Sequence, residues 1–294
     1  QTTNFCSLTK KSNLKIQQQY MLALIKIEWL KLKKYPAFWW MLGIVILTYP
    51  GVNLMFSAIF DSMSKGNEMK SQIVKQLLGN PFAFPEVWHS VAYFSSWFVM
   101  IPAILVIMII ANEYTYKTNR QNIIDGWTRT QFVTSKLFDV LIIALFTTLA
   151  YSMVALCFGF SYSTELEKTR WNEQAQYIPL FLLQTFAQLS IAFLLGFVIK
   201  RSFIALGIFL FYSVLVEPLA VGYISNATAF KKVTSFFPLE ISDKLVPPAA
   251  FIGKFNEETY NQNIKDINIH IAYTCILTAG IWWLCYSLYK KRDL

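Results

Sequence analysis

A run of charged and polar residues, ANEYTYKTNRQNIIDGWTRTQFVTSKL at 111–137, separates two strongly apolar segments. Its chemistry is that of recognition, because the guanidinium groups of Arg120 and Arg129 can form bidentate hydrogen bonds with carboxylates. A short helix of mixed polarity in this position would fit a groove on a partner protein. The alternative is a solvated loop whose basic residues set topology and touch lipid phosphates. Residue types and spacing leave both interpretations open.

The flanks of this run predict where such a helix begins and ends. Gly126 is expected to end a helix over 119–125 in a left-handed conformation, and Thr128 or Thr130 is expected to cap the next helix. The result is a helix of about two turns, roughly 10 Å long. It would carry polar side chains and one apolar pair: Thr118, Arg120, Gln121, Asn122 and Asp125, with Ile123 and Ile124.

Glu113 stands at the border between the first apolar segment and the polar run. It lies four residues before Lys117 and seven before Arg120. Charges at helical spacing can pair along one face of a helix. We therefore expect a charge network that holds the polar run to the end of the preceding helix.

No motif for catalysis or metal binding occurs in the sequence. The G-x-x-x-x-G-K-[ST] pattern of nucleotide-binding loops is missing, as are H-E-x-x-H and G-x-S-x-G. The two histidines, His89 and His270, lie near the ends of apolar segments, where packing is commoner than metal ligation. The pair Glu257-Glu258 falls in a polar loop and is expected to be solvated. The chain is therefore expected not to be an enzyme and to hold no metal or cofactor.

Glu217 is an ionisable residue deep in an apolar run, FYSVLVEPLAVGY. A charge at that depth costs free energy, at least about 2.5 kcal/mol near the centre of a bilayer, so it should be protonated, paired or turned to a polar cavity. A substrate contact or a hinge beside Pro218 is one interpretation. A structural acid that bonds a neighbouring helix or caps the following segment is the other.

The composition places these residues in a membrane protein. Of 294 residues 55% are hydrophobic and only 15% are charged, too few charges for the surface of a soluble domain. Apolar runs long enough to cross ~30 Å of hydrocarbon as helices are unbroken, unlike the alternating strands of a barrel. The predicted fold is all-α, with six spans at about 38–60, 89–112, 138–160, 178–199, 202–224 and 268–289.

Six spans put both termini on one side, and the distribution of Lys and Arg predicts that this side is the cytosol. It would hold 16 basic and 5 acidic residues, against 10 basic and 12 acidic on the other side, with Glu217 assigned there. The net charge of +9 thus reflects orientation in the membrane, and nucleic acid is not expected as a partner.

A basic segment ahead of the first span, residues 20–34, is expected to be a helix lying on the cytosolic membrane surface. Its apolar residues form one stripe at helical spacing: Met21, Leu22, Ile25, Trp29 and Leu32. Trp29 would sit at headgroup depth, and lysines that include Lys31, Lys33 and Lys34 would meet anionic lipid. The alternation from Ile25 to Trp29 leaves a strand open as an alternative.

The remaining segments are less informative. Residues 1–19 are polar and lack an apolar signal core, so a disordered leader before a single domain over 20–294 is expected, with Met21 as an alternative start.

Within the spans, Pro50 and Pro102 are expected to kink or loosen the helices that contain them. The outer segment 225–267 is expected to form short helices. The four cysteines form no C-x-x-C pattern; Cys6 lies in the polar leader, and the other three lie within predicted spans: Cys157, Cys275 and Cys285.

The layout resembles the permease subunit of type-2 ATP-binding-cassette (ABC) exporters. Those permeases have six spans, a basic amphipathic helix before the first span, and a long outer segment after the fifth. They also have an N-E-Y-x-x-K-T stretch leading out of the second span, with arginines downstream. The same pattern stands here at 112–118. The resemblance extends from about Met21 to Lys291.

This resemblance implies that the short helix between the second and third spans is a coupling helix that docks on a separate ATPase. Carried over by position, the interface would comprise Glu113, Thr118, Arg120, Asp125, Gly126 and Arg129. The helix at 20–34 would pack beside the ATPase. ATP and magnesium would be bound by that partner chain.

From this we expect a permease of the bacterial inner membrane that works with an ATPase and with a second permease copy or a homologous permease. The aromatic-rich spans favour an amphipathic substrate such as a lipid, a peptide or a drug-like molecule. A secondary transporter would need more buried charges than Glu217. A membrane-anchored assembly subunit without transport of its own remains an alternative.

Overall fold

A computed structural model describes the protein over residues 25–64, 79–226, 236–253 and 257–291. All regular structure in these residues is helical. The longer helices and the short helix between two of them are α2 (Pro36–Ser64), α4 (Val87–Ser96), α5 (Met100–Thr115), α6 (Thr118–Ile124), α7 (Arg129–Tyr162), α9 (Tyr177–Ile199) and α14 (Glu257–Lys291).

A further helix precedes α2 at residues 25–34 and is called the N-terminal helix below. It coincides with the described part of the helix predicted over 20–34, and the strand alternative for Ile25 to Trp29 is wrong. The leader predicted over 1–19 lies outside the described residues.

Five helices are individually long and apolar enough to cross a membrane: Pro36–Ser62, Arg129–Tyr162, Tyr177–Ile199, Ser202–Ile224 and Tyr260–Lys291. A sixth span results if α4 and α5 are taken together. The predicted all-α membrane fold is therefore confirmed. Two helices extend beyond the apolar spans predicted for them, since α7 begins at Arg129, directly after the expected cap Thr128, and α14 begins at Glu257, ahead of the span at about 268–289. Polar residues continue these helices beyond their apolar portions.

The second span is bent by 48° between α4 and α5. The break at residues 97–99 lies one turn before Pro102, which has no N–H to offer the carbonyl of Phe98. That carbonyl accepts a hydrogen bond from Ile101 N at 3.0 Å instead. The kink predicted from Pro102 is thus present, whereas α2 continues through Pro50.

The fifth span changes its helical type halfway. It consists of α10 (Ser202–Phe211), the π-helical turn η1 (Tyr212–Val216) and α11 (Glu217–Asn226). The N–H of Glu217 donates to the carbonyl of Tyr212, five residues earlier, and Pro218 has no N–H to continue an α-helical ladder. The wider turn rotates the rest of the span relative to α10.

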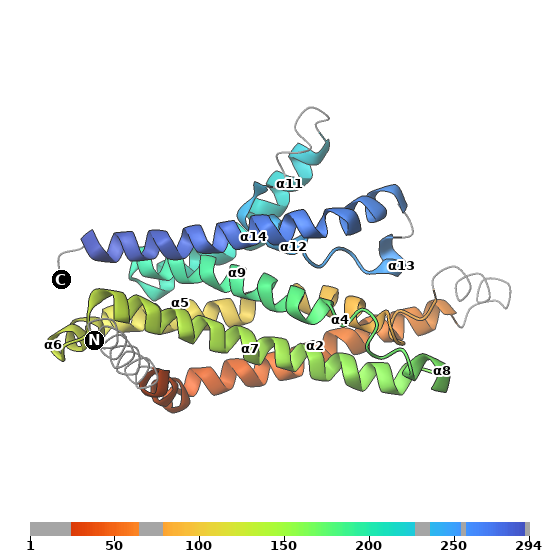
Figure 1. Ribbon diagram of the computed structural model, residues 1–294, viewed down its shortest axis with the longest axis horizontal. Helices are drawn as coiled ribbons and strands as arrows, with labels where there is room; N and C mark the ends of the chain where they lie inside the picture. Colours follow the sequence, from red (N-terminus) through yellow and green to blue (C-terminus); the bar gives the residue numbers. More distant parts are fainter. Residues whose placement is uncertain (1–24, 65–78, 227–235, 254–256, 292–294) are drawn as a thin grey trace, which may run out of the picture.

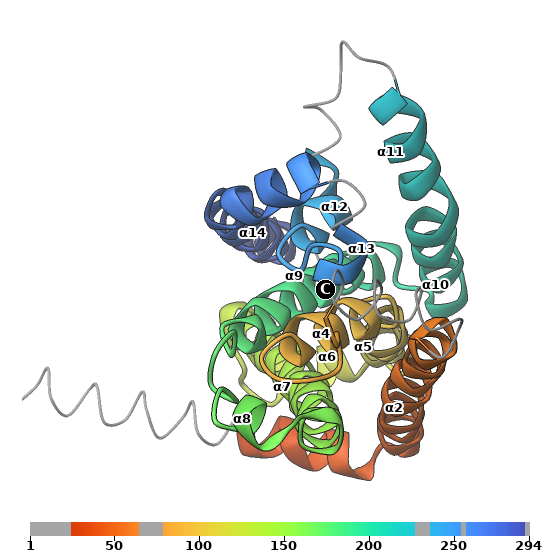
Figure 2. The same ribbon diagram turned by 90° about the vertical axis from the view of Figure 1, so that its right-hand side faces the viewer.

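Helices α2, α5, α7, α9 and α14 lie along the long axis of the molecule, whereas α11 projects away from the bundle (Figure 1). The short helix α6 and the C-terminal end of α14 lie at one end, and the short helices α8 (Glu165–Lys168) and α13 (Ala250–Gly253) lie at the other. Viewed along the bundle, α5, α7 and α14 surround α9, while α2 and α10 lie at an edge (Figure 2). The predicted short helices of the outer segment are present as α12 (Pro238–Asp243) and α13.

Helices α5 and α9 approach each other closely at Gly196. A Cβ atom there would lie 2.5 Å from Ile110 Cγ2 and 3.4 Å from Ile107 Cα. A hydrogen in place of a side chain is therefore what permits this contact. Because α9 is the central helix, its distance from α5 also sets the position of α6, which follows α5 directly.

Candidate docking surface and buried charge cluster

The helix α6 is defined by two sharp turns in the backbone. Lys117 adopts a left-handed conformation with φ 57° and ends α5, and Gly126, with φ 95°, follows the last residues of α6. The side chain of Thr128 then accepts a hydrogen bond from Gln131 N, while the Gln131 side chain accepts one from Thr128 N. This capping box starts α7. The predictions for Gly126 and Thr128 are confirmed.

The residues proposed for docking lie around α6 as follows. Thr118 and Arg120 are exposed, and the Thr118 hydroxyl donates to the carbonyl of Glu113 at 3.4 Å. Asp125 is also exposed and accepts a hydrogen bond from Gln121 Nε2 at 3.0 Å. The apolar side chain of Ile124 is 78% exposed. The helix therefore presents a guanidinium, a carboxylate and an isoleucine on its outer surface.

Arg129 is held by the far end of the chain. Its Nη1 atom donates to the carbonyl oxygen of Lys290 at 2.7 Å. That carbonyl belongs to the last turn of α14, where helix carbonyls have no partner within the helix and cations are stabilised. The resemblance placed Arg129 in the docking interface, whereas the geometry gives it a bond that joins α7 to α14.

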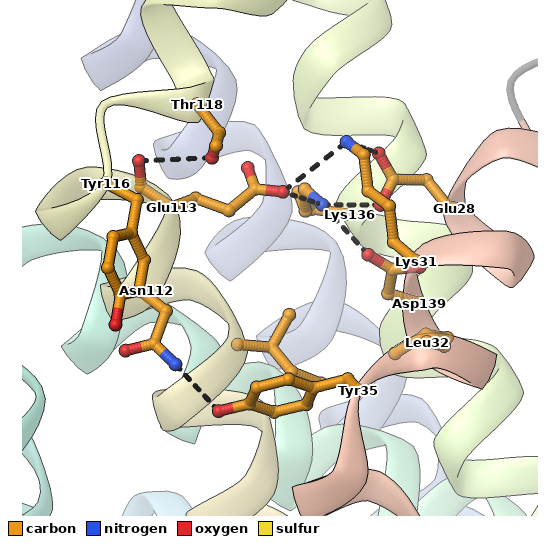
Figure 3. Close-up of a pocket in the computed structure, with 11 residues that line it drawn as sticks. Glu28, Lys31, Leu32, Tyr35, Asn112, Glu113, Tyr116, Thr118, Lys136 and Asp139 are labelled. Carbon is orange, nitrogen blue, oxygen red and sulfur yellow. Dashed lines mark hydrogen bonds and ion pairs between the residues drawn. The ribbon is translucent and has the colours of Figure 1, made fainter.

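Beneath α6 lies a cluster of five charged side chains from the N-terminal helix, α5 and α7 (Figure 3). Lys136 is 1% exposed and lies at its centre. Its Nζ atom is 2.6 Å from Glu28 Oε2, 2.6 Å from Glu113 Oε1 and 3.1 Å from Asp139 Oδ2. Lys31 Nζ lies 3.0 Å from Glu28 Oε1 and 3.7 Å from Glu113 Oε1. The cluster therefore connects three elements through one ammonium group.

The electrostatics of the cluster explain how charges can be buried there. Burial raises the pKa of Glu28, but the ammonium groups of Lys136 and Lys31 outweigh this effect and lower the pKa from 4.5 to about 2. Glu28 is therefore ionised at neutral pH. Loss of Lys136 would leave the carboxyl groups of Glu28, Glu113 and Asp139 buried without their shared cation.

The charge network predicted around Glu113 exists but has other partners. Glu113 pairs with Lys136 and Lys31, not with Lys117 or Arg120. The helical spacing used for the prediction ends at Lys117, where the chain turns into the left-handed conformation. The carboxylate instead points into the bundle, so Glu113 belongs to the interior and not to the outer surface of α6.

The N-terminal helix packs against the bundle through two of the four residues predicted to face lipid. The Trp29 ring is stacked on Phe146 of α7, with centroids 5.9 Å apart and planes 10° from parallel. Lys31 belongs to the charge cluster, whereas Lys33 and Lys34 are exposed. Trp29 and Lys31 thus attach the helix to the protein.

Three members of the cluster were missed in the sequence: Glu28, Lys136 and Asp139 were counted only as charges that orient the chain. A signal for Glu28 was present, because it falls between Ile25 and Leu32 on the otherwise apolar stripe of its helix. An acid on such a stripe predicts a buried partner. Nothing in the sequence identified that partner as Lys136, since the two are 108 residues apart.

Glu217 is 3% exposed and binds the segment that follows its span. Its Oε1 atom accepts hydrogen bonds from the backbone N–H groups of Leu239, at 2.9 Å, and Glu240, at 2.7 Å. These are first-turn donors of α12, which have no partner within a helix. This is the geometry that the capping interpretation of Glu217 requires.

The described residues contain no group of three or more His, Cys, Asp or Glu side chains arranged to hold a metal ion. His89 shows what its ring does instead. Its Nε2 atom lies 2.8 Å from the carbonyl oxygen of Pro247, which can only accept, and its ring is stacked on Tyr177 with centroids 4.3 Å apart. The histidine connects α4 to the outer segment and to α9.

Comparison with known sequences identifies a family for most of the chain. Residues 24–216 match the family described as "ABC-2 family transporter protein". No curated protein matches the chain. The matched region begins just before the N-terminal helix and includes the charge cluster, α6 and the α6–α7 turn.

Proposed function

Because the match covers most of its length, the chain belongs to the ABC-2 family of transporter membrane proteins, and we propose that α6 couples it to a separate ATPase. The family assignment makes the protein an integral membrane permease domain that lacks ATPase activity of its own. Energy would come from ATP and magnesium bound by the partner. The docking residues would be Thr118, Arg120 and Asp125 around α6, with Gly126 shaping the turn that follows.

The observation that carries this proposal is the way α6 is fixed to the bundle. Its preceding helix ends two residues after Glu113, a member of the buried cluster, and its following helix contains Lys136, the centre of that cluster. A force on the exposed face of α6 would therefore act on a rigid ionic junction of three helices. A solvated loop that only set topology would not need this anchoring.

A large cavity in the other half of the molecule supports an amphipathic substrate. It has a volume of about 630 Å³, within the range of ~300–1,000 Å³ usual for ligand sites. Aromatic side chains of Tyr93, Trp97 and Phe209 line it together with the carboxyl groups of Glu240 and Asp243. A molecule with an apolar body and a polar group would find partners on both kinds of wall.

In the working complex we propose two permeases, identical or homologous, above two ATPases in the bacterial inner membrane, with both termini in the cytosol. ATP binding would draw the ATPases together, move the docked α6 helices and shift the spans between conformations. The direction would be export of a lipid, a peptide or a drug-like molecule.

Purification of the full chain in mild detergent from its native membrane tests the coupling proposal. We expect an ATPase to co-purify, and Arg120→Glu to lower both the bound ATPase and its turnover by about tenfold, as expected when a charge in an interface is reversed. Arg201→Glu is the matched control, since Arg201 is an exposed arginine on the same predicted side, between α9 and α10.

Equal loss in both variants, or no loss in Arg120→Glu, would show that α6 is not the docking element. Substrate movement driven by an ion gradient in vesicles without any ATPase would favour a secondary transporter. ATPase binding without movement of any amphipathic substrate would favour the assembly subunit.

A further inference from the structure

A cavity of about 250 Å³ opens beside the charge cluster, between the N-terminal helix, α5, α6 and α7. All of the cluster's charged residues line it, and Leu32 and Ile109 supply apolar wall. Tyr35 and Asn112 lie along the same wall and are bonded to each other, with Asn112 Nδ2 donating to Tyr35 Oη at 2.7 Å. The cavity therefore has a charged part and an apolar part.

Two carboxylate oxygens of the cluster have no hydrogen-bond partner among the described residues: Glu113 Oε2 and Asp139 Oδ1. Glu113 is 8% exposed and Asp139 is 3% exposed, so water in bulk does not compensate them. In Figure 3 the second oxygen of Glu113 points away from Lys136. A buried oxygen of this kind costs free energy unless a donor reaches it.

The described part of the protein does not supply the missing donors. The ammonium group of Lys136 has three N–H bonds, and three carboxylates already lie within 3.1 Å of its nitrogen. Lys31 lies against Glu28 and against the other oxygen of Glu113. Three carboxyl groups thus share two ammonium groups, and the remaining oxygens of Glu113 and Asp139 lack an N–H donor among the described residues.

We propose that this cavity binds a primary ammonium group. Such a group is cationic and compact, and it offers three N–H donors to the oxygens of Glu113 and Asp139. A trimethylammonium group has the charge but no N–H, so it would leave both oxygens without a donor.

An aminophospholipid headgroup is one source of this chemistry and a free alkylamine is the other. Ile109 lies six residues before the end of α5, roughly 9 Å along the helix, so the cavity stands at the depth of the headgroups. Leu32 and Ile109 would face the first carbons beyond the headgroup. The side chain of Lys31, 40% exposed at the same cavity, would meet the lipid phosphate.

Binding to the full chain in detergent tests the proposal independently of any ATPase. Native mass spectrometry would measure the affinities for phosphatidylethanolamine and phosphatidylcholine with identical acyl chains. Thermal unfolding with ethylammonium chloride, against sodium chloride at equal ionic strength, would examine the free amine. We expect the ethanolamine lipid to bind about tenfold or more tightly than the choline lipid, because only its headgroup donates hydrogen bonds.

Two conservative variants localise the effect. Asp139→Asn and Glu113→Gln each replace a carboxyl group that lines the cavity by an amide of similar size, and each should reduce the preference for the ethanolamine headgroup about tenfold. Glu165→Gln is the control, since that carboxylate pairs with Lys168 on exposed α8 at the other end of the bundle.

The outcomes distinguish the two sources of the ammonium group, a lipid headgroup and a free amine, and they also test whether the cavity binds an ammonium group at all. Stabilisation by ethylammonium that Asp139→Asn abolishes would support an amine site open to free amines. A preference for the ethanolamine lipid without any effect of ethylammonium would support a site for the lipid alone. Equal affinities for both lipids together with no effect of ethylammonium would overturn the proposal, as would a preference that persists in both cavity variants.

Discussion

At the scale of single residues, Lys136 is the residue on which the charge cluster is built. A lysine rarely lies fully buried unless it is paired, and this one is paired with carboxylates from three different elements. Its four-carbon stem reaches from α7 to both neighbours, so one side chain fixes the positions of the N-terminal helix and α5 together. The stability of the junction is therefore concentrated in one residue.

Replacing Lys136 with methionine should strongly destabilise the protein. The apolar stem is kept, but the carboxylates of Glu28, Glu113 and Asp139 lose their shared cation while they remain buried. We expect a loss of about 3–5 kcal/mol in the free energy of unfolding, measured by denaturant titration in detergent.

Lys168→Met is the control for this experiment. Lys168 also pairs with a carboxylate three residues away, at 2.7 Å, but the carboxyl group of Glu165 is 89% exposed. Its loss should cost no more than about 1 kcal/mol. If both variants lost the same small amount, the cluster would not hold the junction together.

At the scale of helices, the approach of α5 to α9 is set by the absence of a side chain at Gly196. Helix pairs in membranes are held largely by close packing, which small residues permit. The two helices cannot keep their present distance if a side chain is added to either helix at this contact.

Gly196→Ala should therefore weaken the bundle. The added methyl group would meet Ile110 and the backbone of Ile107, and relieving that overlap should cost about 1–3 kcal/mol. Gly207→Ala on α10 is the matched control, since its Cβ would meet nothing within 4 Å. Thermal unfolding in detergent should show a lower Tm for the first variant, and an unchanged or higher Tm for the second. A higher Tm for Gly196→Ala would show that the helices can separate at no cost.

Helix existence and type were predictable from the sequence, because an apolar run of about 20 residues has few other ways to satisfy its backbone in lipid. The ends of α6 and the cap at Thr128 were predictable for a similar reason, since glycine and threonine act locally. The partners of Glu113 were not, because they depend on how helices far apart in the chain pack. The π-turn before Pro218 had a local cause but was not predicted, whereas the bond from Glu217 to α12 agrees with the capping interpretation, one of two that the sequence left open.

At the scale of the whole molecule, α6 and the short helix α8 lie at opposite ends of the bundle (Figure 1). The excess of Lys and Arg predicts that the α6 end faces the cytosol. This orientation determines which compartment could supply a docking partner.

Single cysteines introduced at the two ends would test the orientation, in a background in which the native cysteines are replaced by serine. Arg120→Cys on α6 and Glu173→Cys in the turns after α8 both change exposed positions. A membrane-impermeant maleimide should label the Arg120→Cys variant only in inverted vesicles and the Glu173→Cys variant only in right-side-out vesicles. The reverse pattern would place α6 on the far side of the membrane and remove the basis for coupling to a cytosolic ATPase.

The hydrogen bond from Arg129 to the carbonyl of Lys290 has a mechanical consequence. It links α7, the third span, to α14, the last span, at the end of the bundle where the proposed ATPase would dock. A displacement of the α6–α7 corner would thus reach the far edge of the bundle by a short path outside the lipid, and the final span would tilt in step with the third.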